Sequence, residues 1–294
     1  MKSYIVKSDL VYEQYEEWEK QFIQNDEINA SAYHDPDSRS VSYYEDLTSF
    51  LNKRENSVEG LQRKFVYERS NNPFGIRVKV SDNPNVVFYL KSDQLGFSAT
   101  KGIYQKYVQN ASESLRSKTL RKEALQQISK WIYDSRSIGG AFVWAMDWNG
   151  EKWICNPHYN KTRGKKPIQD RADLTLLDIK NCYCNNKDTG IKYGSRLRYQ
   201  YDTREYTKKW LEHFGTGMDG FRKYIEFFCF DEFMLNENPK DLLTGKEIID
   251  FKDERYKTSL FDYKNEDLSI LLSNLHAWIT ARFNKMEKIM NLPS

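Results

Sequence analysis

The sequence predicts an α+β protein: a central, mostly antiparallel sheet at about residues 62–155, packed by helices, followed by a helical C-terminal half. Apolar and polar residues alternate in short runs between 62 and 155, which is typical of half-buried strands. From residue 170 onward apolar residues recur every three to four positions, which is typical of amphipathic helices. Because no internal repeat or low-complexity linker appears, we expect one domain over residues 1–294.

Two helices with acidic outer faces are expected at residues 9–54. Asp9 is a good N-cap residue for the first helix, over 10–24. Ser42 and Glu45 have the spacing of a capping box for the second helix, which should end near Lys53. These helices form the acidic N-terminal part of the predicted domain.

The β-rich part follows at 62–155. A turn at 81–85 predicts one hairpin, and the Asn149-Gly150 pair predicts another after a buried apolar strand. Strands are expected at 64–67, 76–80, 86–90, 139–146 and 153–154, with a late edge strand at 247–251.

The remaining periodic segments predict helices, of which the last, over 266–290, is the longest. Gly215 lies where a helix C-cap belongs, and Asp219 can open the next helix, so an antiparallel helix pair is expected there. Helices are expected at 118–133, 170–183, 196–214, 219–234 and 266–290.

Composition indicates a folded, water-soluble protein with a ring-rich core. Aromatic residues make up 15% of the chain, and each large ring buries about 150–250 Å². The N-terminus lacks the apolar stretch of a secretion signal, and no window is long enough to span a bilayer, so we expect a cytoplasmic protein without membrane contact. Four cysteines in such a chain are expected to stay reduced.

Charge is distributed unevenly along the chain. Residues 9–59 contain 13 acidic and 4 basic residues, whereas residues 61–130 contain 13 basic and 5 acidic residues. The excess stays basic over 152–192, with 9 against 4. This basic middle can bind a polyanion, or the acidic ends can fold back onto it.

The segment 154–183 contains the first candidate site. It joins a strand to a helix through a basic loop, and cations near a helix N-terminus are a common way to hold phosphate. The candidate catalytic residues are His158, Arg163, Arg171 and Asp173, and the candidate phosphate-binding residues are Asn160, Lys161, Lys165 and Lys166.

A structural interpretation explains the same residues without a ligand. Asp170 would cap the helix, Asp173 would occupy the capping-box position, and Arg163 or Arg171 would pair with Asp173. The loop would then be fixed by ion pairs. Only an open cleft around the two arginines would make it a functional site.

The stretch 192–210 interleaves aromatic and basic residues, a composition expected of a surface that binds single-stranded nucleic acid. Its candidate ligand-binding residues are Arg198, Arg204 and Tyr206. The alternative is a helix whose rings face the core while its cations face solvent.

Several short motifs occur in an order that resembles an uncharacterised bacterial protein family of unknown function. They are Asp35-Pro36-Asp37-Ser38, Ile138-Gly139-Gly140, Asn160-x-x-Arg163-Gly164, Asp170-Arg171-x-Asp173-Leu174-Thr175-Leu176 and Phe221-x-x-Tyr224-Ile225-x-Phe227-Phe228. The order and rough spacing of the family pattern hold over residues 35 to about 251. The resemblance implies a bacterial or phage cytoplasmic protein and no particular activity.

Two function hypotheses follow. In the first, the chain binds RNA or another phosphate-bearing ligand, and its sharpest form is a toxin- or defence-type ribonuclease using His158 as acid or base. In the second, the terminal helices bind a protein partner or a second copy, without catalysis. No cofactor motif is present, and the spacing of Cys182 and Cys184 does not suit a zinc site, so neither cofactor nor metal is expected.

Overall fold

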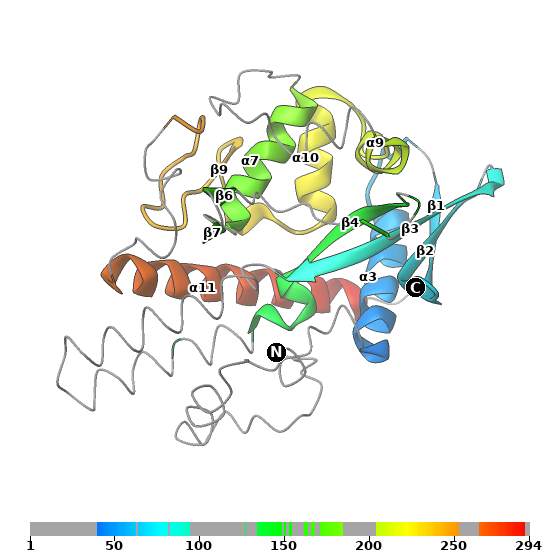
Figure 1. Ribbon diagram of the computed structural model, residues 1–294, viewed down its shortest axis with the longest axis horizontal. Coiled ribbons are helices and arrows are strands. Elements are labelled where there is room, and N and C mark those ends of the chain that lie inside the picture. Colours follow the sequence, from blue (N-terminus) through cyan, green and yellow to red (C-terminus); the bar gives the residue numbers. More distant parts are fainter. Residues whose placement is uncertain are drawn as a thin grey trace.

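The fold combines a five-stranded antiparallel sheet with helices that pack against it and beside it (Figure 1). The computed structural model describes residues 40–62, 64–81, 83–94, 127, 134–148, 150, 153–154, 162–163, 166–167, 171–184, 204–252 and 265–291. The helices expected at 10–24 and 118–133 lie outside these residues, apart from residue 127.

Five strands form the sheet in sequence order: β1 (Phe65–Asn71), β2 (Phe74–Val80), β3 (Asn83–Gln94), β4 (Ala141–Trp148) and β5 (Trp153–Ile154). All neighbours are antiparallel, as expected. Both predicted hairpins are present, since Val80 pairs with Asn83 and Trp148 with Trp153. The α+β prediction is confirmed.

The late edge strand expected at 247–251 does not join this sheet. Glu247 instead forms an isolated antiparallel bridge with Lys240. Ile248 and Phe251 pack with Leu174 and Leu177 of helix α7 (Ala172–Tyr183) in a small apolar cluster of their own. The alternating apolar pattern therefore reflects packing against a helix.

Helix α3 (Val41–Ser57) starts two residues earlier than expected. Ser40 is the N-cap residue, and its Oγ accepts a hydrogen bond from the Tyr43 amide at 3.2 Å, so the capping box predicted at Ser42 is not used. The extra residues place Tyr43 and Tyr44 in the core, both fully buried.

Four further helices complete the described core: α7, α9 (Glu205–Glu212), α10 (Gly217–Phe227) and α11 (Asn265–Met290). Figure 1 shows α7 beside α10 and the long α11 lying below both of them in this view. The chain turns between α9 and α10 at Gly215, whose φ of 108° suits glycine. Short elements fill the rest: η3 (Ile138–Gly140), η4 (Asp231–Phe233), β6 (Thr162–Arg163), β7 (Lys166–Pro167), β8 (Met234–Leu235) and β9 (Asn238–Pro239).

Glycines in η3 allow close backbone packing, at Gly139 against α11 and at Gly140 against Ser135. A Cβ on Gly139 would lie 2.6 Å from the carbonyl oxygen of Ile279, and one on Gly140 would lie 2.2 Å from that of Ser135. Both distances are shorter than a real Cβ contact, so any side chain would displace the backbone. The Ile-Gly-Gly motif thus has a packing role.

Among the helices that the structure describes, none combines the length and apolar character needed to cross a bilayer.

Candidate functional site

The structure describes the candidate residues ahead of α7 only in part. His158, Asn160, Lys161, Lys165 and Arg198 lie outside the described residues. Arg163 and Lys166 belong to the small hairpin of β6 and β7, where they are directly paired across the two strands. The backbone therefore brings these two cationic residues opposite each other, five and eight residues before Arg171.

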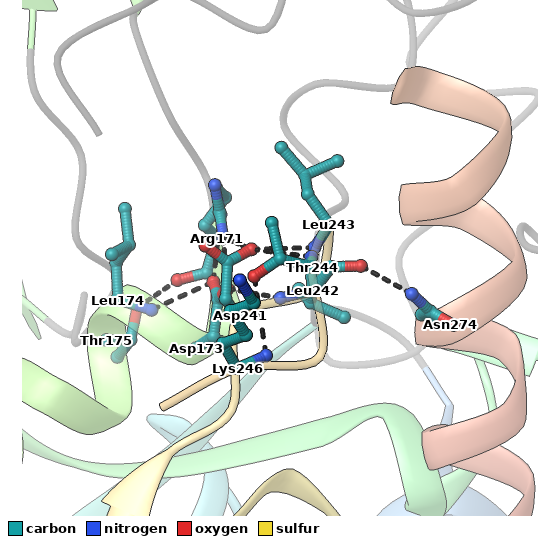
Figure 2. A network of polar contacts seen from close by, with 10 residues as sticks. All are labelled: Arg171, Asp173, Leu174, Thr175, Asp241, Leu242, Leu243, Thr244, Lys246 and Asn274. Atoms are coloured by element: carbon teal, nitrogen blue, oxygen red, sulfur yellow. Dashed lines mark hydrogen bonds and ion pairs between the residues drawn. The ribbon is translucent and has the colours of Figure 1, made fainter. Parts of the chain in front are cut away.

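Arg171 and Asp173 lie in a buried network at the N-terminus of α7 (Figure 2). The Arg171 guanidinium donates from Nε to Asp173 Oδ1 at 2.9 Å and pairs through Nη2 with Asp173 Oδ2. Nη2 also reaches Asp241 Oδ1 at 3.2 Å. The expected ion pair between Arg171 and Asp173 is confirmed, and all three side chains are at most 1% exposed.

The network has two carboxylates and one guanidinium, and backbone amides help to stabilise the excess negative charge by donating to both carboxylates. Asp173 accepts from Leu174 N at 2.9 Å and from Leu242 N at 2.8 Å, while Asp241 accepts from Leu243 N at 2.7 Å. Charge-assisted bonds of this kind are stronger than neutral ones. The network therefore fastens residues 241–244 onto α7, and its guanidinium is shared by two carboxylates.

The structural interpretation of this helix start needs correction at two positions. The N-cap residue of α7 is Arg171, without a side-chain cap bond, so Asp170 is not the N-cap residue, and Asp173, two residues after Arg171, is not at the capping-box position. Thr175 adds a hydrogen bond from its Oγ1 to the Arg171 carbonyl at 3.0 Å. The helix start is stabilised from within the buried network.

Arg204 and Tyr206 lie at the start of α9. The Tyr206 ring stacks on Phe88, 5.8 Å between centroids, and Trp210 of the same helix is fully buried. The described part of the 192–210 stretch thus has the ring-lined core face of the second interpretation.

A carboxylate from the sheet caps this helix. Asp147 accepts from Tyr206 N at 3.3 Å and from Thr207 Oγ1 at 3.0 Å. Partial burial raises the pKa of the Asp147 carboxyl, and these hydrogen bonds together with nearby Arg204 oppose that rise. The positive charge of Arg204 therefore interacts with the Asp147 carboxylate of the same chain.

A histidine that sequence reasoning did not single out forms a second polar site. His276 of α11 contacts a carboxylate oxygen of Asp134 through Nδ1. The Asp134 side chain is 3% exposed and that of His276 is 26% exposed. The two residues are 142 positions apart in the sequence. The only signal in the sequence is therefore that His276 is a polar residue within a mostly apolar helical pattern.

A cavity of about 330 Å³ borders α10 and β8, but the described residues that line it offer no unpaired charged side chain to a ligand. Its charged lining residues are paired: Arg222 with Glu237, Glu226 with Arg54, and Asp231 with Lys285. No cluster of three or more His, Cys, Asp or Glu side chains suited to a metal ion occurs among the described residues.

The architecture defines an α+β protein with buried ionic networks at the ends of its helices. A sequence model for a family of unknown function, DUF6994, matches residues 18–286, and the chain belongs to this family. The resemblance drawn from the motifs is thereby confirmed, and the match extends beyond them at both ends to include most of α11. No curated protein and no solved structure matches the chain.

Proposed function

We propose that this chain binds RNA or another phosphate-bearing ligand through the hairpin of β6 and β7 and the loop before it. The carrying observation is the direct pairing of Arg163 with Lys166 across the hairpin. Like charges at directly opposed positions destabilise a β-ribbon. A bound anion removes that repulsion.

The surrounding sequence leaves this charge without compensation from its own segment. Residues 152–169 include five Lys or Arg residues and no Asp or Glu. Positions that break a local rule are expected at functional sites. Polyphosphate backbones attract such segments strongly, and the attraction falls with salt.

Arg171 has a different role in this proposal. Its guanidinium is engaged by Asp173 and Asp241, so it fixes the start of α7 rather than contacting the ligand. Ligand contact then belongs to the cations of the hairpin and the preceding loop.

The test measures binding of a labelled single-stranded RNA by fluorescence anisotropy at several salt concentrations. The double variant Arg163→Ala, Lys166→Ala should bind more weakly, and the slope of log K against log salt should become less steep by about 1.4 for two lost single-strand contacts. The matched control is Lys208→Ala, Lys209→Ala on α9, where both lysines already pair with glutamates. It should bind like the wild type.

Competition with inorganic phosphate separates the possible ligands. A small phosphate ligand predicts that phosphate displaces the RNA completely, whereas an RNA site predicts displacement only through ionic strength. Absence of salt-dependent binding, or equal loss in both double variants, would refute the proposal.

The partner-binding alternative involves both terminal helices, of which the structure describes α11, and on α11 a partner would have to use the polar face. Leu271, Leu272, Leu275, Ile279 and Phe283 of this helix are buried in the core. Light scattering on the purified chain tests it through the mass in solution, since a homo-oligomer has a multiple of the monomer mass.

A further inference from the structure

The contact between Asp134 and His276 resembles the arrangement of a catalytic histidine whose ring is oriented by a carboxylate. Asp134 is almost fully buried and touches Nδ1 of the imidazole. A carboxylate at Nδ1 holds the proton there and leaves the lone pair of Nε2 to accept another proton. The tautomer that a general base requires is thus favoured.

The side chain of His276 is partly exposed, at 26%, and its Nε2 makes no hydrogen bond with the described residues. His213, the other histidine that the structure describes, differs in this respect: its side chain is completely buried, and its Nε2 is bound to Glu55 at 3.0 Å. Only His276 of these two can meet a substrate.

The dyad is connected to the start of α7 through α11. Asn274, two residues before His276, donates to the Leu242 carbonyl at 2.6 Å, and the Leu242 amide donates to Asp173 (Figure 2). The hairpin of β6 and β7 ends four residues before Arg171, a span of at most about 14 Å. These contacts link the dyad to the same end of α7 that the hairpin precedes in the chain.

We propose that His276 is a general base for cleavage of RNA, with Asp134 as its positioning residue. This inference rests on the proposed RNA-binding function. Nε2 takes the proton from a ribose 2′-hydroxyl, and O2′ attacks the adjacent phosphorus while the bond from phosphorus to O5′ breaks. The imidazolium returns the proton to the departing O5′, giving a 2′,3′-cyclic phosphate and a 5′-hydroxyl.

The competing explanation is that the contact between Asp134 and His276 only stabilises the fold, by holding α11 against the segment that contains Asp134. His276→Asn separates the two, because the asparagine amide can still donate to Asp134 from the Nδ1 position but has no basic Nε2. Ser269→Ala is the matched control: it removes a hydrogen bond from the same helix, to Gln127 at 3.1 Å, without touching the dyad.

The experiment compares cleavage of a labelled single-stranded RNA with cleavage of the same sequence carrying 2′-O-methyl groups. The wild type should cut only the unmodified RNA and leave 2′,3′-cyclic phosphate ends. His276→Asn and His276→Ala should cut at least about 100-fold more slowly with RNA affinity unchanged, and Ser269→Ala should cut normally. Asp134→Asn should lower kcat while KM stays the same.

Each opposite result decides against the dyad. Cleavage by His276→Asn at the wild-type rate, cutting of the 2′-O-methyl strand, or absence of cleavage by a wild-type protein that binds RNA would overturn the proposal. Absence of RNA binding would instead overturn the proposed function, which the anisotropy measurement reports separately. Circular dichroism of each variant shows whether a lost rate reflects unfolding.

Discussion

Buried charged residues in this protein are held by backbone groups as well as by opposite charges. The guanidinium of Arg282 is 1% exposed, and it donates to the carbonyls of Phe228, Gly139 and Ala141 at 2.6–2.8 Å while lying over the Phe230 ring. Burial lowers the pKa of Arg282 to about 10, so it stays charged at neutral pH. The cost of desolvating a charge is offset by fixed dipoles.

His213, at the C-cap position of α9, illustrates the same point. In the structure the ring stacks on Phe65, 3.9 Å between centroids, and bonds to Glu55 of α3. A distant partner decides its environment, which no local pattern could reveal.

The network around Arg171 yields the residue-scale prediction. Replacing Asp173 by Asn puts an amide NH2 group at a position where a carboxylate oxygen now accepts hydrogen bonds, while Asp241 remains beside Arg171. Breaking a buried ion pair costs about 3–5 kcal/mol, and the remaining carboxylate places the effect at the lower end of that range. Asp173→Asn should therefore lower the free energy of unfolding by about 3 kcal/mol in urea titrations.

The control for this prediction is an exposed ion pair. Glu237→Gln breaks the contact with Arg222 at the surface and should leave the urea midpoint nearly unchanged. If Asp173→Asn also left it unchanged, the network would not be the tie inferred from its geometry.

At the scale of elements, α3 protects the open edge of the sheet. Asn52 donates to the Tyr67 carbonyl at 2.9 Å and accepts from the Tyr67 amide at 3.0 Å, as a neighbouring strand would. Glu55 accepts from the Phe65 amide at 2.8 Å and from the Tyr67 hydroxyl at 3.0 Å. An exposed edge strand invites pairing with another chain, and these side chains prevent it.

Asn52→Leu should expose that edge. Two hydrogen bonds are lost and the Tyr67 backbone groups are left without partners, so the free energy of unfolding should fall by about 2 kcal/mol. Light scattering should show more self-association on warming. Asn56→Ala, one turn further along the exposed face of α3, should behave like the wild type, and an equal effect of both changes would exclude edge protection as the cause.

Sequence patterns predicted where helices and strands lie better than they predicted what each element packs against. Strand alternation and the Asn149-Gly150 turn depend on adjacent residues, and the hairpins were found where expected. The choice between Ser40 and Ser42 as a cap depends on which residues enter the core, and the segment 247–251 packs on α7 although its pattern suits a strand. Tertiary packing decides such cases.

The candidate site shows the same division. The pair of Arg171 with Asp173 is two residues apart and was predicted as one of the two interpretations. Asp241 joins it from 70 residues away, and Asp134 reaches His276 from 142 residues away. Contacts at such separations follow from the fold and have no local signal.

At the scale of the whole molecule, the C-terminal end of α10 joins the two ends of the described fold. Arg54 of α3 donates to the carbonyls of Glu226 and Phe227, and Arg282 of α11 donates to that of Phe228. Cations at a helix C-terminus also suit its dipole. The long terminal helix is therefore part of the fold, consistent with a family match that includes most of it.

Deleting residues 265–294 should consequently prevent folding. The deletion removes the buried face of α11 and uncovers Gly139, to which Ile279 and Phe283 pack, and it leaves the carbonyl of Phe228 without its guanidinium. Removing one large buried side chain costs about 2–5 kcal/mol, and a whole face exceeds the 5–15 kcal/mol that stabilises a typical protein. We expect insoluble protein, or soluble protein without a cooperative thermal transition by circular dichroism. Deletion of residues 292–294, which lie beyond α11, should leave the transition intact; a folded protein without α11 would mean that this helix is an appendage available to a partner.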